Sequence, residues 1–297
     1  MERFEQESDT VTDRTTGLMW TRNAAVFDLP MTWTETLEAI RGANAGGWGG
    51  FQDWRLPNRR ELFSLVSHRS INPCLPPHHP FDSVFPGYYW TSTTCSRLPD
   101  EAWTLHMGGA RIHRGMKYAS YLAWPVRSAG IGAGVWQTGQ LACYDDCGGE
   151  IPCMGTGQDG DTKGGRAWDE SRFSVRADTV LDRLTRLEWI RHADAAGGPV
   201  DWETAFRVVD TLNRDRISGK GDWRLPSVRE LESLTDMSAH SPALPPFHPF
   251  LDVRPHYWSS TTSRYETRYS WALYLEDGGV GVGFKPLADF FVWAVRG

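Results

Sequence analysis

Six side chains that can bind an anion lie in one short segment of this 297-residue chain, and they are Arg97, His106, Arg111, His113, Arg114 and Lys117. Arginine and histidine donate hydrogen bonds to sulfate or carboxylate groups, and arginine can do so through two parallel N–H groups. In Arg111-Ile-His113 the polar residues alternate, so both side chains share one face of a strand. The segment predicts a binding surface for an anionic polysaccharide or a surface protein. The alternative is a charged strand face that is only solvated.

A related segment near the C-terminus differs in charge. Residues 97–127 carry a formal charge of +3, whereas residues 264–296 carry a formal charge of 0. The second segment is rich in tyrosine and arginine, which are favoured in protein contacts. It therefore predicts an alternative function, a variable display or scaffold protein that binds a protein partner through Arg264, Tyr265, Arg268, Tyr269 and Tyr274.

Two helices and several short strands must position these residues. Thr32 can cap a helix whose apolar positions are Trp33, Leu37 and Ile40, and Asn58 with Glu61 forms a capping-box pattern at a second helix. A hairpin is predicted over residues 11–20, and strands are predicted over residues 88–94, 102–107, 111–117 and 123–127. This order of hairpin, helices and antiparallel strands is typical of an α+β fold.

The whole pattern occurs twice. Residues 11–20 match residues 180–189, and residues 53–62 match residues 222–231, at the same spacing along the chain. We therefore expect a tandem duplication that forms an intramolecular pseudo-dimer, with the first repeat in residues 1–129, a Gly/Cys-rich linker in 130–173 and the second repeat in 174–297. Both repeats are expected to use the same structural residues, which are Trp20, Trp54, Arg55, Glu61, Trp90 and Trp103 in the first and Trp189, Trp223, Arg224, Glu230, Trp258 and Trp271 in the second.

The five cysteines suggest disulfides. Cys74 and Cys95 are both absent from the second repeat, where Ala243 and Ser263 stand, and joint absence is what a lost disulfide leaves. In the linker, Cys143 and Cys153 are the expected pair. If these bonds form, the compartment is oxidising, so the protein is extracellular, periplasmic or on the cell surface. The alternative is a cytoplasmic protein with free thiols.

Composition and motifs exclude several other classes. A formal net charge of -6 lacks the basic excess of a general nucleic-acid binder. No apolar run is long enough to span a membrane. Of His68, His78 and His79, only His79 has a counterpart, His248, and zinc needs about four donors at defined spacing. We expect no metal site and no cofactor.

Four ordered motifs carry a family resemblance. They are Thr16–Trp20, Asp53–Leu62, Tyr89–Thr93 and Val126–Arg127, and each has a counterpart in the second repeat. The chain resembles the Lcl C-terminal domain family along nearly its whole length. The resemblance implies a C-type-lectin-like fold, an exported or surface-attached bacterial protein, and adhesion through sulfated or other anionic polysaccharides. The residue triplets with which calcium-dependent lectins hold sugars are absent.

The resemblance also leaves open an enzyme. Formylglycine-generating enzymes are distant relatives of this fold, and their chemistry needs a cysteine pair that binds copper. Cys74 and Cys95 are the only candidates inside a repeat. No catalytic triad and no paired carboxylates are evident. We therefore expect a non-catalytic binding protein.

Overall fold

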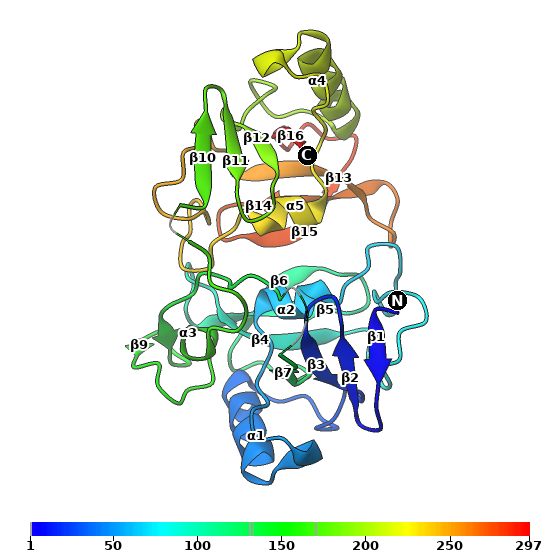
Figure 1. The fold of residues 1–297 in the computed structure, drawn as a ribbon, viewed down its shortest axis with the longest axis vertical. Helices are drawn as coiled ribbons and strands as arrows, with labels where there is room; N and C mark the ends of the chain where they lie inside the picture. The colour runs from blue at the N-terminus through cyan, green and yellow to red at the C-terminus, as the bar shows by residue number, and fades with distance from the viewer. Residues whose placement is uncertain (1, 131, 133, 170) are drawn as a thin grey trace. The chain divides into compact units, whose positions relative to one another are not determined.

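The computed structural model describes residues 2–130, 132, 134–169 and 171–297. The chain divides into two compact units, one ending at Ala167 and the other beginning at Trp168. Each unit combines short helices with small antiparallel sheets, which confirms the predicted α+β class and the tandem duplication (Figure 1).

In the first unit a sheet in the order β1-β2-β3-β7 lies beside a second antiparallel sheet, in which β5 pairs with both β4 and β6. Its elements are β1 (Phe4–Gln6), β2 (Thr10–Asp13), β3 (Leu18–Thr21), α1 (Trp33–Ala45), η1 (Trp48–Gly50), α2 (Arg59–Ser64), β4 (Tyr88–Thr94), β5 (Glu101–His106), β6 (Ile112–Met116), β7 (Val126–Ser128), β8 (Cys143–Tyr144), β9 (Glu150–Ile151) and α3 (Asp159–Thr162).

The second unit repeats this plan, with one sheet in the order β10-β11-β12-β16 and another in which β14 pairs with β13 and β15. Its elements are β10 (Phe173–Arg176), β11 (Thr179–Asp182), β12 (Glu188–Ile190), α4 (Trp202–Arg214), η2 (Ile217–Gly219), α5 (Val228–Ser233), β13 (His256–Thr262), β14 (Tyr269–Tyr274), β15 (Gly279–Phe284) and β16 (Val295–Arg296).

The helices begin where the sequence places their caps. The side chains of Thr32 and Asn58 accept the backbone N–H groups of Glu35 and Glu61, and each glutamate accepts the N–H group of its cap in return. The second unit starts its equivalent helices in the same way, with Asp201 at α4 and a capping box from Ser227 at α5. Each cap satisfies N–H groups that have no partner inside the helix.

The recurring tryptophans form the core of each unit. Trp20, Trp54, Trp90 and Trp103 are buried in the first unit. In the second unit their counterparts are buried in the same way, and these are Trp189, Trp223, Trp258 and Trp271. Each Trp carries one N–H group that needs a partner when buried, and Trp90 donates it to the carbonyl of Met31.

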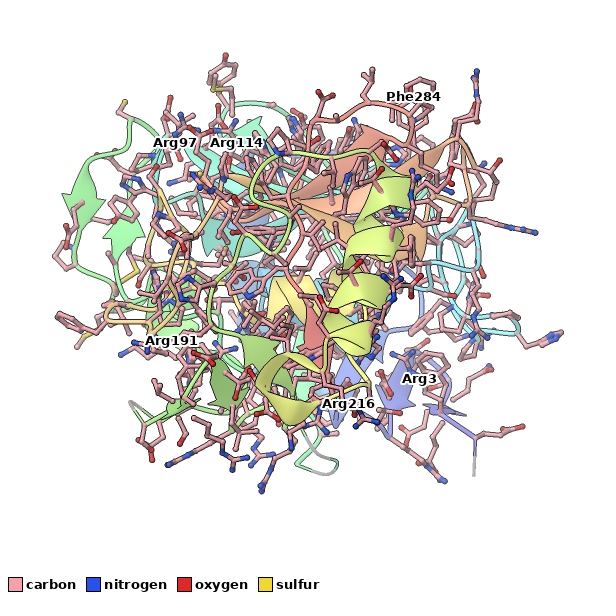
Figure 2. All side chains as sticks on the ribbon, turned by 90° about the horizontal axis from the view of Figure 1, so that it is seen from above. Arg3, Arg97, Arg114, Arg191, Arg216 and Phe284 are labelled. Carbon is pink, nitrogen blue, oxygen red and sulfur yellow. A yellow bond between two sulfur atoms is a disulfide. The ribbon has the colours of Figure 1, made fainter. Side chains whose placement is uncertain are left out.

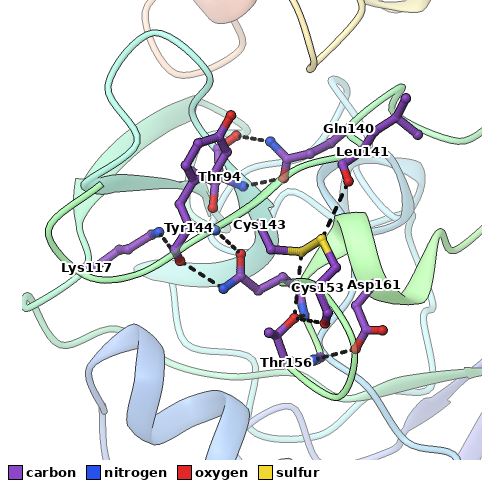
Figure 3. The surroundings of a disulfide bond; sticks show 11 residues. Thr94, Lys117, Gln140, Leu141, Cys143, Tyr144, Cys153, Thr156 and Asp161 are labelled. Atoms are coloured by element: carbon purple, nitrogen blue, oxygen red, sulfur yellow. Dashed lines mark hydrogen bonds between the residues drawn. A yellow bond between two sulfur atoms is a disulfide. The ribbon is translucent and has the colours of Figure 1, made fainter. Parts of the chain in front are cut away.

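The Gly/Cys-rich segment is a folded part of the first unit. We call residues 135–166 the strap. Its two ends meet where Trp136 bridges Arg166, and its middle is closed by a disulfide between Cys143 and Cys153 (Figure 3). The strap carries β8, β9 and α3, and the boundary between the units follows it at Ala167.

Candidate functional site

Two of the predicted anion-binding residues lie at the start of β6, and both are exposed. Arg111 and His113 are exposed on either side of the buried Ile112, so their side chains alternate as the sequence predicts. The Nδ1 atom of His113 lies 2.6 Å from the carbonyl oxygen of Arg114. Arg111 has no ion-pair partner among the described residues, so its guanidinium is open to an external anion.

His106 connects this edge to an aromatic surface. Its backbone N–H donates to the carbonyl of Arg111, and its ring packs edge-on against Tyr88 at 4.7 Å between centroids. Burial, together with the positive charge of Arg111, lowers the pKa of His106 below its usual value of 6.5. A lowered pKa favours the neutral imidazole, which can both donate and accept a hydrogen bond.

A cavity of about 630 Å³ opens beside His106 in the first unit. Its lining is mainly apolar, with three rings from Phe85, Tyr88 and Tyr121, and its polar side chains come from Asp28, Ser83 and Ser120. The Tyr88 and Tyr121 rings lie 5.4 Å apart. Because Tyr88 contacts both the cavity and His106, the aromatic floor and the cationic edge form one continuous surface.

Three predicted cations lie away from this surface. Arg97 follows β4 and Arg114 lies within β6, and both are labelled in Figure 2. Arg97 is exposed near Glu101, the first residue of β5. His106 is the last residue of that strand, so Arg97 and His106 lie at opposite ends of it. Arg114 is partly buried and lies 3.5 Å from Glu101 between Nε and Oε2. The cations therefore do not form one cluster.

Lys117 does not belong to a binding face. It is fully buried, and its Nζ donates to the carbonyl oxygens of Tyr144 and Asp145 in the strap at 3.0 and 2.9 Å. The ammonium also lies 4.2 Å from the centre of the Trp33 ring. Burial lowers its pKa to about 8 although nearby aspartates oppose the shift. The backbone carbonyls of the strap occupy the place where we expected a ligand.

In the second unit, an ion pair lies at the position that corresponds to the cavity of the first unit. Arg254 and Asp194 replace Phe85 and Ala25, and they lie 3.1 Å apart between Nε and Oδ2. His192 and Asp252 form a second pair at 2.7 Å beside it. The two repeats thus differ where the first one is hollow.

The candidate partner-binding residues of the second unit are only partly accessible. Arg264 and Tyr265 are exposed, and Arg268 is exposed but paired with Glu266 at 3.2 Å. The other two tyrosines are packed. Tyr269 lies 5.2 Å from the Phe284 ring, and the hydroxyl of Tyr274 donates to the carbonyl of Val282.

The disulfide between Cys74 and Cys95 was a wrong prediction, because both cysteines are buried and neither is disulfide-bonded. The backbone N–H of Cys74 donates to Met107, just beyond one end of β5, and that of Cys95 donates to Glu101 at the other end. Six residues of extended strand separate those ends by roughly 17–20 Å, far beyond the ~7 Å that a disulfide tolerates between Cα atoms. That both cysteines are missing from the second repeat does not show how far apart they lie in the first.

The predicted bond between Cys143 and Cys153 is confirmed, with 5.1 Å between the Cα atoms. Closing a loop of this size restricts the unfolded chain and stabilises the fold by about 2–3 kcal/mol. Cys147, in the same loop, is free and exposed.

Comparison with protein families matches the family model of the Lcl C-terminal domain to residues 9–127 and 178–296. The chain belongs to the Lcl C-terminal domain family. Its two Lcl C-terminal domains coincide with the two predicted repeats, and the strap follows the first of them. A search of curated proteins found no match. Within the described part of the chain, no helix is long and apolar enough to cross a membrane, and no three His, Cys, Asp or Glu side chains are grouped to hold a metal.

The cavity and the strap contacts were missed by sequence reasoning. Phe85, Tyr88 and Tyr121 become Arg254, His256 and Phe290 in the second Lcl C-terminal domain. This divergence is a signal that could have found the cavity, because the surrounding motifs barely change.

Proposed function

We propose that the protein is a non-catalytic binding protein whose first Lcl C-terminal domain binds an anionic saccharide. The observation that carries the proposal is the continuity of the aromatic cavity with His106 and Arg111 through the Tyr88 ring. A sugar ring has an apolar face and polar edges, and a cavity lined by rings and a few polar groups suits both.

The aromatic cavity and the cationic edge contact different parts of the saccharide. Phe85 is 58% exposed, so its ring is available to stack on a sugar that enters the cavity. Arg111 is placed to receive a sulfate or carboxylate through charge-assisted hydrogen bonds, each of which contributes about 1.5–3 kcal/mol. An anion beside His106 would raise its pKa, so we expect affinity to increase as the pH falls below neutrality.

Export of the protein is part of this proposal. The Cys143–Cys153 disulfide favours a non-reducing compartment. Cys74 and Cys95 lie at opposite ends of β5 and cannot act together as a thiolate pair, which favours binding over the chemistry of formylglycine-generating enzymes. The family relationship supports the lectin-like reading.

A second candidate function is binding of a surface protein by the second domain. Tyr265 is 66% exposed in the loop between β13 and β14, beside the exposed Arg264. An exposed tyrosine and arginine together are typical of protein contact sites.

Titration calorimetry with a sulfated oligosaccharide tests the saccharide proposal. We expect Arg111→Ala and Phe85→Ala each to weaken binding about tenfold or more, and we expect affinity to fall with added salt because a charge pair is screened. Arg268→Ala in the second domain is the matched control and should leave affinity unchanged. Binding that ignores salt and both substitutions in the first domain would exclude this site.

A further inference from the structure

The strap covers a polar strand edge of the first unit. The amide of Gln140 accepts from the backbone N–H of Thr94 at 2.8 Å and donates to its carbonyl at 2.7 Å, as a neighbouring strand would (Figure 3). One residue earlier, the hydroxyl of Thr93 donates to the carboxylate of Asp159 at 2.7 Å, and Thr138 donates to the same oxygen at 2.6 Å. Thr93 and Thr94 are fully buried as a result.

The strap also covers the start of α1 and the ion pair beside α2. Gly157 of the strap approaches the Leu37 side chain, and the strap carbonyls hold Lys117 over Trp33. At Gly164 a Cβ atom would lie 2.9 Å from Glu61 and 3.0 Å from Arg55, so the strap backbone rests directly on that pair.

Within the described residues, the same groups of the second unit are not covered by a strap. Thr261 and Thr262, which correspond to Thr93 and Thr94, are partly exposed. Phe206 is 36% exposed where Leu37 is 6% exposed. Within the described residues no side chain takes the place of Gln140 at Thr262.

The charged groups of this face are likewise more open. Arg224 and Glu230 remain paired at 2.6 Å, but their side chains are 40% and 21% exposed, against 16% and 0% for Arg55 and Glu61. Lys285 lies 4.0 Å from the Trp202 ring, as Lys117 lies over Trp33, but its one hydrogen-bond partner among the described residues is the hydroxyl of Thr262 at 2.9 Å.

We propose that this face of the second unit, formed by Trp202, Phe206, Thr261, Thr262 and Lys285, binds an extended segment of a partner polypeptide. The inference goes beyond the saccharide site, which it does not use. The strap indicates which groups this partner segment needs, because in the first unit it binds the equivalent residues of a homologous domain.

The strap specifies what the partner segment must carry. A glutamine amide pairs with the backbone edge of Thr262, and a carboxylate accepts from the hydroxyl of Thr261. The Thr261 oxygen already accepts the N–H group of Val228, so its proton is free to donate to that carboxylate. Two successive backbone carbonyls receive the ammonium of Lys285, and a glycine packs against Phe206.

The test uses the full chain and a synthetic disulfide-bonded peptide of residues 135–166 as the probe. We expect saturable binding of one peptide per chain, measured by calorimetry. Lys285→Met should weaken binding at least tenfold, and Arg111→Ala, which lies in the saccharide site, should not change it. Because the peptide itself can be varied, peptides with Gln140→Leu or Asp159→Leu test the same contacts without any risk to the fold of the protein, and each should bind at least tenfold more weakly.

Three results would overturn the proposal. The first is no saturable binding of the peptide, and the second is binding that Lys285→Met leaves unchanged, which would mean that the peptide displaces the strap in the first unit. The third is a dimer of the chain alone that Lys285→Met dissociates, since a second copy would then be the occupant. None of these results bears on saccharide binding, which is measured separately.

Discussion

The two Arg–Glu pairs provide the same interaction in two environments, so equivalent substitutions can be compared within one chain. Glu61 accepts two hydrogen bonds from Arg55 and one from the N–H of Asn58, and its side chain is completely buried. Glu230 accepts the same three bonds, from Arg224 and Ser227, but remains 21% exposed.

The perturbation is Glu61→Gln compared with Glu230→Gln. Removing one partner of a buried pair leaves the other charge uncompensated, which costs about 3–5 kcal/mol. Where water reaches both partners, the loss is about 1 kcal/mol or less. The strap over Gly164 is the reason for the difference, so we expect Glu61→Gln to lower the unfolding free energy of its unit by at least about 2 kcal/mol more than Glu230→Gln lowers that of the other.

Native-state hydrogen exchange of the α2 and α5 amides measures the two units separately in the intact chain. The pH dependence gives a further check, because the hydrogen bonds from Arg224 and Ser227 lower the pKa of Glu230 against the opposing effect of its burial. That contribution to stability is present above the usual pKa and is lost as the pH falls through the lowered value. Equal losses for the two substitutions would refute the reasoning that the strap sets the strength of the pair.

Two further predictions concern the strap itself. Cys143→Ser should lower the stability of the first unit by about 2–3 kcal/mol, measured by urea unfolding with and without reductant, and a wild-type protein insensitive to reductant would contradict it. Burial raises the pKa of Asp159 to about 6 from a usual 3.8. At a pH between these two values, the Asp159 carboxyl is protonated in the folded domain and ionised in the unfolded chain. Its contribution to stability is therefore full below pH 4 and falls by about 3 kcal/mol as the pH rises past 6. Asp159→Asn should remove that fall, and parallel pH profiles of wild type and variant would count against it.

Local structure could be predicted from sequence because its causes lie within a few residues. Thr32, Asn58, Asp201 and Ser227 each precede the N–H group that they cap by three residues, so a short pattern is sufficient. The duplication made such predictions stronger, since each pattern occurs twice. The Cys143–Cys153 bond was predictable for the same reason, because a short loop keeps the two thiols close.

The candidate site was less predictable because its environment comes from distant segments. Lys117 has the sequence context of an exposed strand residue, but its partners are carbonyls 27 and 28 residues further along the chain. Cys74 and Cys95 share a pattern of occurrence and yet lie at opposite ends of one strand. The cavity depends on where Phe85 and Tyr121 meet, which a one-dimensional pattern does not contain.

The strap restricts which substitutions the first domain tolerates more than it restricts those of the second domain. In the first copy, Thr93 and Thr94 must stay compatible with Asp159 and Gln140, so a tolerated change at one position needs a compensating change at another. In the second copy, Thr261 and Thr262 contact Val228 and Lys285, and among the described residues no strap couples the two threonines to each other. A library of variants selected only for folding would then accumulate single substitutions in the second repeat and coupled substitutions in the first. Two copies that began as identical would diverge in this way.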